Sequence, residues 1–115
     1  MHLGRVGLWT FQLDLQPAAA ARETVAELEE LGYPTVWLPE AVGREPFVNS
    51  AMLLGATKTM VVPTGIASVW GRDAMTMAAG HLSLNEAFDG RFLLGLGVSH
   101  QPMVDYVRGH QYDKP

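Results

Sequence analysis

The sequence has 115 residues, of which 48% are hydrophobic and 17% are charged, and its formal net charge is −4. This length and composition are typical of one folded domain and exclude a disordered tail. The negative charge balance gives no electrostatic reason to bind nucleic acid or an anionic membrane. The absence of cysteine excludes disulfides, thiolate metal sites and a cysteine nucleophile.

The first half of the chain predicts two strands, each followed by a helix. Residues 6–11 form a short, β-rich apolar run and are predicted to be a strand. Pro17 suits the first position of a helix, and from Ala18 to Leu31 apolar residues recur along one face. Residues 35–38 predict the second strand, and a second helix is expected from Phe47 to about Thr59.

The second half repeats this pattern. Residues 60–67 predict a strand, in which Pro63 should lie near the start or at a bulge because it lacks an N–H group. Asp73 is positioned to cap a helix over residues 74–87. Residues 91–96 predict the fourth strand, and a helical turn is expected around residues 103–107.

Strands and helices that alternate with short connections imply parallel strands joined by right-handed crossovers. Such units normally close an eight-stranded barrel, and this chain has about half of one. Ligands in these folds bind at the carboxyl ends of the strands. Four stretches therefore become candidates for a site: residues 10–13, 39–44, 68–72 and 97–102.

Two side chains in these stretches could move a proton. A carboxylate such as Glu40, directly after a strand, can act as a general acid or base or bind a cofactor ring. The alternative is that Glu40 is a solvated loop residue or pairs with Arg44. His100 could donate a proton near neutral pH, and the alternative is a surface histidine.

Other potential sites are not indicated. The segment from Gly95 to His100 allows close approach of a ligand or another backbone but does not fit the dinucleotide fingerprint. The four histidines show no metal-ligand spacing, so no metal is expected. Asp105 and Arg108 are expected to pair on the surface. The N-terminus has no signal-peptide pattern and no apolar run could span a membrane, so we expect a cytoplasmic protein.

Four motifs at the strand ends together resemble the luciferase-like monooxygenase superfamily, most closely its coenzyme F420-dependent oxidoreductases. They are GLWT at residues 7–10, VWLPEA at 36–41, TGIASVW at 64–70 and GRFLLGLGV at 90–98. The resemblance covers residues 1–115 as one partial domain. It implies an α/β fold, the N-terminal half of a (β/α)8 TIM barrel with about four parallel strands and crossover helices.

The resemblance also implies a function and a cofactor. It implies hydride transfer between the deazaflavin F420 and a small organic substrate. The alternative is an FMN-dependent monooxygenase. F420 enzymes of this family carry a non-prolyl cis peptide in a bulge behind the ring, which by resemblance is Ser68–Val69. Gly97, Val98 and Ser99 match the loop along the cofactor, and Glu40 and His100 match positions near the reacting carbon.

A complete barrel takes about 250 residues or more, which leaves three interpretations of this chain. It could be a fragment of an F420-dependent oxidoreductase that is inactive alone, which we favour. Two copies, as a homodimer, or a partner half could complete a barrel and restore activity. The chain could instead be a non-catalytic half-barrel that serves as an interaction module.

Overall fold

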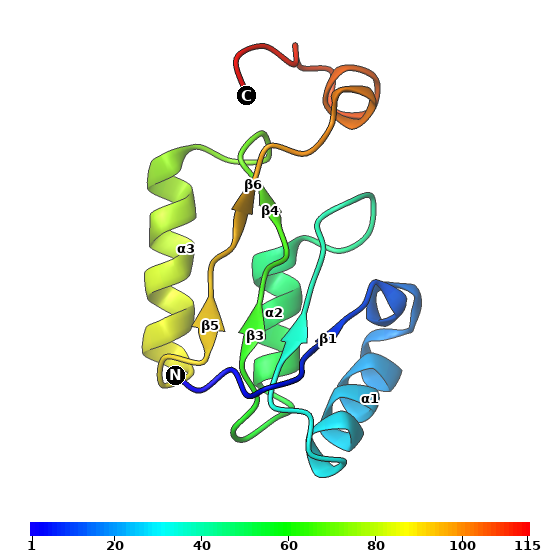
Figure 1. The fold of residues 1–115 in the computed structure, drawn as a ribbon, viewed down its shortest axis with the longest axis vertical. Coiled ribbons are helices and arrows are strands. Elements are labelled where there is room, and N and C mark those ends of the chain that lie inside the picture. Colours follow the sequence, from blue (N-terminus) through cyan, green and yellow to red (C-terminus); the bar gives the residue numbers. More distant parts are fainter.

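The computed structural model describes residues 1–115 as a parallel sheet with helices on one face (Figure 1). The turn η2, Met103–Val107, is π-helical, and η1, Gln12–Leu15, is a 3-10 helix. The other elements, in chain order, are β1 Leu8–Trp9, α1 Ala18–Glu30, β2 Val36–Trp37, α2 Pro46–Leu54, β3 Val62–Pro63, β4 Ala67–Ser68, α3 Ala74–Ala87, β5 Phe92–Leu93 and β6 Leu96–Gly97. The alternation of strands and helices predicted from the sequence is confirmed.

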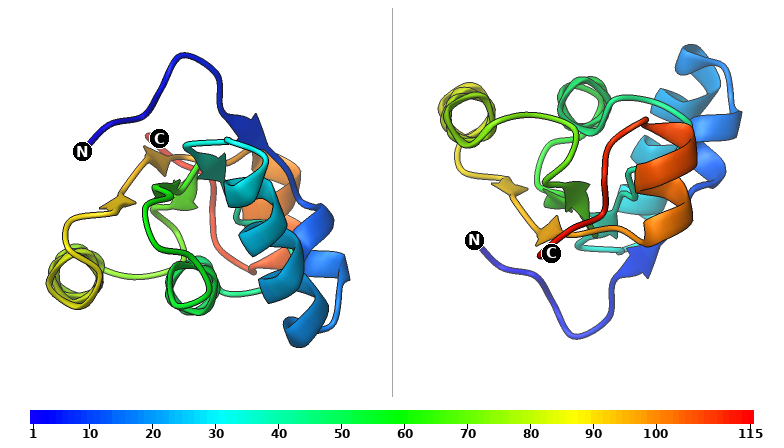
Figure 2. Two further views of the ribbon diagram at one scale, coloured as in Figure 1. Left: turned by 90° about the horizontal axis from the view of Figure 1, so that it is seen from below. Right: turned by 90° about the horizontal axis from the view of Figure 1, so that it is seen from above.

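Every strand pair is parallel. β1 pairs with β2, β3 with β5 and β4 with β6, while bridges from Thr35 to Val61 and from Leu38 to Thr64 join β2 to β3. The helices α1, α2 and α3 lie on one side of the sheet, and the N-terminal segment crosses the other side (Figure 2). No helix is both long enough and apolar enough to cross a membrane.

The hydrophobic core lies between the sheet and the helices. Leu38, Val62 and Phe92 from the strands pack with Leu53 and Leu54 from α2, and all five are fully buried. Burying side chains of this size stabilises the fold by about 1.5–3 kcal/mol each. The core therefore anchors the sheet on its helical face only.

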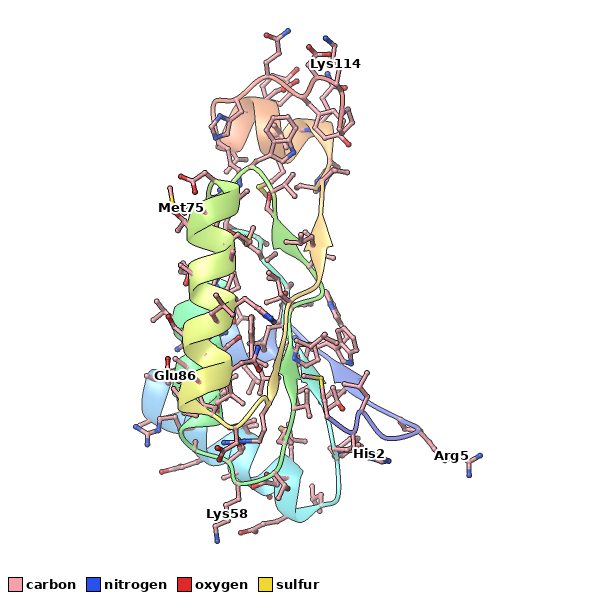
Figure 3. The ribbon with its side chains drawn as sticks, turned by 90° about the vertical axis from the view of Figure 1, so that its left-hand side faces the viewer. His2, Arg5, Lys58, Met75, Glu86 and Lys114 are labelled. Carbon is pink, nitrogen blue, oxygen red and sulfur yellow. The ribbon has the colours of Figure 1, made fainter.

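The long axis separates two ends of the molecule. Lys58 lies at one end and Lys114 at the other, and the carboxyl ends of the strands point toward the Lys114 end (Figures 1 and 3). The candidate site residues of the sequence analysis belong to this second end.

The predicted strand over residues 60–67 is two strands, β3 and β4, separated by a bulge. The Thr64 hydroxyl accepts a hydrogen bond from the Gly95 N–H and donates one to the Gly95 carbonyl, both at 2.9 Å. A side chain thus replaces regular backbone pairing where the strand breaks. Pro63 is the last residue of β3, so it lies directly before the bulge rather than in it.

The helix α2 ends at Leu54 rather than near Thr59. The backbone N–H groups of Lys58, Thr59 and Met60 donate to the Glu29 carboxylate instead of to helix carbonyls. Burial acts to raise the pKa of Glu29, but these hydrogen bonds outweigh it and lower the pKa. One carboxylate on α1 therefore shapes the turn that enters β3.

We expect Glu29→Gln to lower the free energy of unfolding by about 1–3 kcal/mol, because an amide cannot accept three N–H bonds as strongly as a carboxylate. Chemical denaturation at pH 7 measures the change. Glu30→Gln is the matched control, since Glu30 is exposed at the end of the same helix. Equal stability of the two variants would contradict this role for Glu29.

Candidate active site at the carboxyl ends of the strands

The carboxyl ends of the strands lie along one edge of the sheet, which we call the carboxyl edge. The bulge between β3 and β4 forms the centre of this edge. The Trp9 indole N–H donates to the Gly65 carbonyl at 2.7 Å, and the Gly65 N–H donates to the Leu38 carbonyl at 2.7 Å. Trp9 is 54% exposed, so its ring forms an open aromatic wall beside the bulge. Segments β1, β2 and the bulge are thereby held in register at one edge.

The structure corrects the position of the non-prolyl cis peptide. It joins Gly65 to Ile66, not Ser68 to Val69. Ser68 pairs with Gly97, and the Val69 N–H donates to the Gly97 carbonyl at 3.0 Å, so the predicted peptide belongs to the regular β4–β6 ladder. The break in strand pairing lies earlier, at the bulge.

The predicted cofactor-binding residues lie together at the end of the β4–β6 pair. Ser68 is buried, whereas Val69 and Val98 are partly exposed at the edge. A Cβ atom on Gly97 would lie 2.6 Å from the Ile66 side chain, so only glycine lets the two segments approach this closely. Ser99 has a φ of 59° and turns the chain away from β6.

Glu40 is the most highly connected side chain of the site. Its carboxylate accepts the Ser68 N–H at 2.6 Å and two hydrogen bonds from Arg72, at 2.8 and 3.1 Å. A further hydrogen bond of 2.9 Å comes from Arg108, which is 68 residues away in the sequence. Because a carboxylate has about four acceptor positions, all of them are used within the protein.

These contacts determine the charge of Glu40. The side chain is only 7% exposed. Burial acts to raise the pKa of Glu40, but the hydrogen bonds from Arg72 and Ser68 and the charges of Arg72 and Arg108 outweigh it and lower the pKa. The same ion pair, with a second one from Arg72 to Glu45 at 2.9 Å, overcomes burial and raises the pKa of Arg72. Glu40 is therefore an ionised anchor at neutral pH rather than a proton donor.

His100 lies at the same edge, but no hydrogen bond joins it to Glu40. The side chain is exposed, and its backbone carbonyl accepts the N–H groups of Met103 and Val104 at the start of η2. The structure thus places both predicted catalytic residues at the carboxyl edge without bringing them into contact.

Two expected ion pairs do not form. Glu40 does not pair with Arg44, which donates instead to the carbonyls of Leu13 and Gln16. Arg108 pairs with Glu40 rather than with Asp105, whose carboxylate accepts the Tyr112 N–H at 2.7 Å. In both cases an arginine reaches a partner that is distant in the sequence.

Sequence reasoning missed Arg72 and Arg108 as site residues. Arg72 lies two residues after the TGIASVW motif, which was a usable signal, since a cation there can meet a carboxylate after the neighbouring strand. Arg108 had no such signal, because its partner lies 68 residues away.

Comparison with known proteins identifies the fold family. The profile of the luciferase-like monooxygenase family matches residues 1–115. The chain belongs to this family. The resemblance drawn from the strand-end motifs is thereby confirmed.

Two curated proteins are similar to this chain in sequence, and their names include a cofactor or a substrate. The chain is 31% identical, over its full length, to a Mycobacterium tuberculosis protein assigned as a coenzyme F420-dependent oxidoreductase, of which it covers 32%. It is 30% identical over 76% of its length to the 5,10-methylenetetrahydromethanopterin reductase of Methanolobus tindarius, of which it covers 27%. The chain spans about a third of the length of these relatives.

Solved structures of the family show the same fold. The coenzyme F420-dependent tetrahydromethanopterin reductase of Methanopyrus kandleri superposes with a TM-score of 0.79 at 15% identity, over 94% of this chain and 30% of that one. The FMN complex of the oxygenating constituent of 3,6-diketocamphane monooxygenase from Pseudomonas putida gives 0.76 at 16% identity, over 92% and 32%. The fold of this luciferase-like chain is therefore α/β with parallel strands, consistent with half of a TIM barrel, as predicted.

The edge of this luciferase-like chain fits a planar ring better than a phosphate group. Trp9, which contacts the bulge at Gly65, and Val98, which follows β6, both present exposed apolar surface. Arg44, Arg72 and Arg108, the arginines near the strand ends, all donate to acceptors within the protein. The residues present can thus contact a ring, and no uncommitted arginine is available for an anionic tail.

We expect Glu40→Gln to lower the free energy of unfolding at pH 7 by about 2–3 kcal/mol, since it removes a buried charge from two arginines. Because the folded pKa of Glu40 is lowered, its contribution is complete above the ordinary value of 4.5 and is lost as the pH falls through the folded pKa. Wild type should therefore lose more stability than the variant between pH 7 and pH values below 4.5. Denaturant titrations across this range measure the difference.

Glu86→Gln is the control for this experiment, because Glu86 is an exposed residue on the outer helix α3 (Figure 3). Its acid dependence should match that of the wild type. The same acid dependence in Glu40→Gln would show that the Glu40 charge contributes nothing to stability.

Proposed function

We propose that this chain supplies the ring-binding edge of a coenzyme F420-dependent oxidoreductase that acts on a small organic substrate. The observation that carries the proposal is the bulge at Gly65, flanked by the exposed Trp9 ring and the end of the β4–β6 pair. An apolar, aromatic edge at the carboxyl ends of parallel strands suits a flat heteroaromatic ring.

Sequence similarity favours F420 over FMN. The relative assigned as an F420-dependent oxidoreductase is 31% identical over the whole chain. The FMN-bound neighbour is 16% identical, and that likeness reports only on the fold. FMN is therefore the alternative cofactor, and a titration with both compounds distinguishes them.

A bound F420 would supply a hydride for a small organic substrate, which would also take up one proton. The residues of this chain orient the ring and exclude water. Trp9, Ile66 and Val98 would contact the ring, and the backbone of Ser68 and Val69 keeps the underlying ladder rigid.

The proton of this reaction needs a group that is free to release it. Glu40 is unsuited, since its carboxylate is ionised and fully hydrogen-bonded. His100 is exposed at the same edge, and no hydrogen bond to its imidazole forms within the chain. We therefore assign the proton-transfer role to His100 and the anchoring role to Glu40.

The proposal is tested by titrating the chain with F420 and, separately, with FMN, following cofactor fluorescence. We expect saturable binding with a preference for F420. Trp9→Leu should weaken F420 binding by about tenfold, the effect of losing an aromatic contact of ~1.4 kcal/mol. The free energy of unfolding should fall by about 0.5–1.5 kcal/mol, because the variant also loses the indole hydrogen bond to the Gly65 carbonyl.

Tyr33→Leu is the matched aromatic control, because Tyr33 follows α1 at the amino-terminal end of the strands. It should leave binding unchanged. If the folded wild-type chain binds neither compound saturably, or if Trp9→Leu binds F420 as the wild type does, the proposed function is wrong for this edge.

A further inference from the structure

The segment after β6 folds back over the strand ends. Ser99 turns the chain, η2 follows, and the remaining residues return toward β4 (Figures 1 and 2). Val104, in the middle of η2, is fully buried although the turn is short. The Arg108 N–H donates to the Met103 carbonyl at 3.0 Å and completes the π-helical turn. We refer to residues 99–112 as the strap.

One ion pair connects the strap to the loop that follows β2. The Arg108 guanidinium lies 2.9 Å from the Glu40 carboxylate, and the two side chains are 23% and 7% exposed. Gly71 leaves the room for this pair: a Cβ atom there would lie 2.9 Å from Glu40 Oε1 and 3.4 Å from Arg108 Nη1. The contact is therefore enclosed and charge-assisted, which makes it stronger than an exposed surface pair.

Aromatic contacts hold the returning end of the strap. The Trp70 ring lies 6.1 Å from that of His110 and 5.8 Å from that of Tyr112, measured between centroids. The Trp70 indole N–H donates to the Val98 carbonyl at 2.7 Å. Trp70 thus links the strap to the end of the β6 strand, where the proposed ring site begins.

We infer that Arg108 is a positioning residue, which locks the strap onto Glu40 and so holds Trp70 and Val98 in place at the ring-binding edge. The inference deepens the proposed function and rests on it for the identity of the ligand. Arg108 acts through Glu40 and Trp70 and is not expected to touch the reacting atoms.

The hydrogen bonds to Glu40 indicate that Arg108 can be replaced without unfolding the chain. The other partners of Glu40, which are Arg72 and the Ser68 N–H, belong to the sheet and its loops. Removing the Arg108 charge leaves Glu40 paired with Arg72. The strap should therefore loosen while the core and the β4–β6 ladder stay intact.

Hydrogen exchange of the ligand-free chain, followed by mass spectrometry, tests the lock without any cofactor. In Arg108→Gln we expect peptides covering residues 99–112 to exchange about tenfold faster than in the wild type, and peptides from α1, α2 and α3 to be unchanged. Arg22→Gln, on the exposed face of α1, is the control and should change neither set. Unchanged exchange in the strap would overturn the inference.

Two further variants keep the test sharp. Arg108→Lys retains the charge but not the planar fork, so it should give intermediate exchange. Gly71→Ala should push the carboxylate and guanidinium apart and loosen the strap as Arg108→Gln does. If Arg108→Gln or Arg108→Lys instead speeds exchange throughout the helices, Arg108 has a general structural role and the inference is wrong.

A fluorescence titration with F420 adds the functional readout. We expect Arg108→Gln to weaken F420 binding relative to Arg22→Gln, because Trp70 and Val98 are no longer held. Unaltered F420 affinity in a variant with a loosened strap overturns the positioning role. Absence of F420 binding in the wild type instead overturns the proposed function. The exchange experiment still tests whether Arg108 holds the strap on Glu40.

Discussion

The carboxylate of Glu40 joins segments that are far apart in the sequence. It accepts hydrogen bonds from the backbone after the bulge, from Arg72 before α3 and from Arg108 in the strap. A buried carboxylate is stable only when its charge is matched by donors, so each of these segments must reach the same point. The order of the carboxyl edge depends on this requirement more than on any single strand pair.

The side chains around Glu40 fall into two groups, arginines that form ion pairs and apolar groups that are exposed. The arginines neutralise Glu40 and Glu45 and are committed to the protein. The apolar groups, Trp9 and Val98 among them, stay open to a ligand. A site that combines a rigid ionic base with an apolar surface is suited to orienting a flat ring.

The sequence predicted the elements well where they depend on interactions between residues that are close in the sequence. The capping carboxylate of Asp73 accepts the Thr76 N–H, and the helix runs over residues 74–87 as predicted. The end of α2 was predicted too late because Glu29, on another helix, captures the N–H groups that would have continued it. Periodicity within one segment carries no information about such a competitor.

The sequence by itself determined the alternation of strands and helices, the family and the residues that gather at the carboxyl edge, since these follow from local patterns and from motifs at strand ends. Tertiary structure alone decided how the charges pair. Glu40 meets Arg108 rather than Arg44, and the break in the third strand falls at Gly65 rather than after Ser68. Both outcomes arise from contacts between distant segments, which only the folded chain brings within hydrogen-bonding distance.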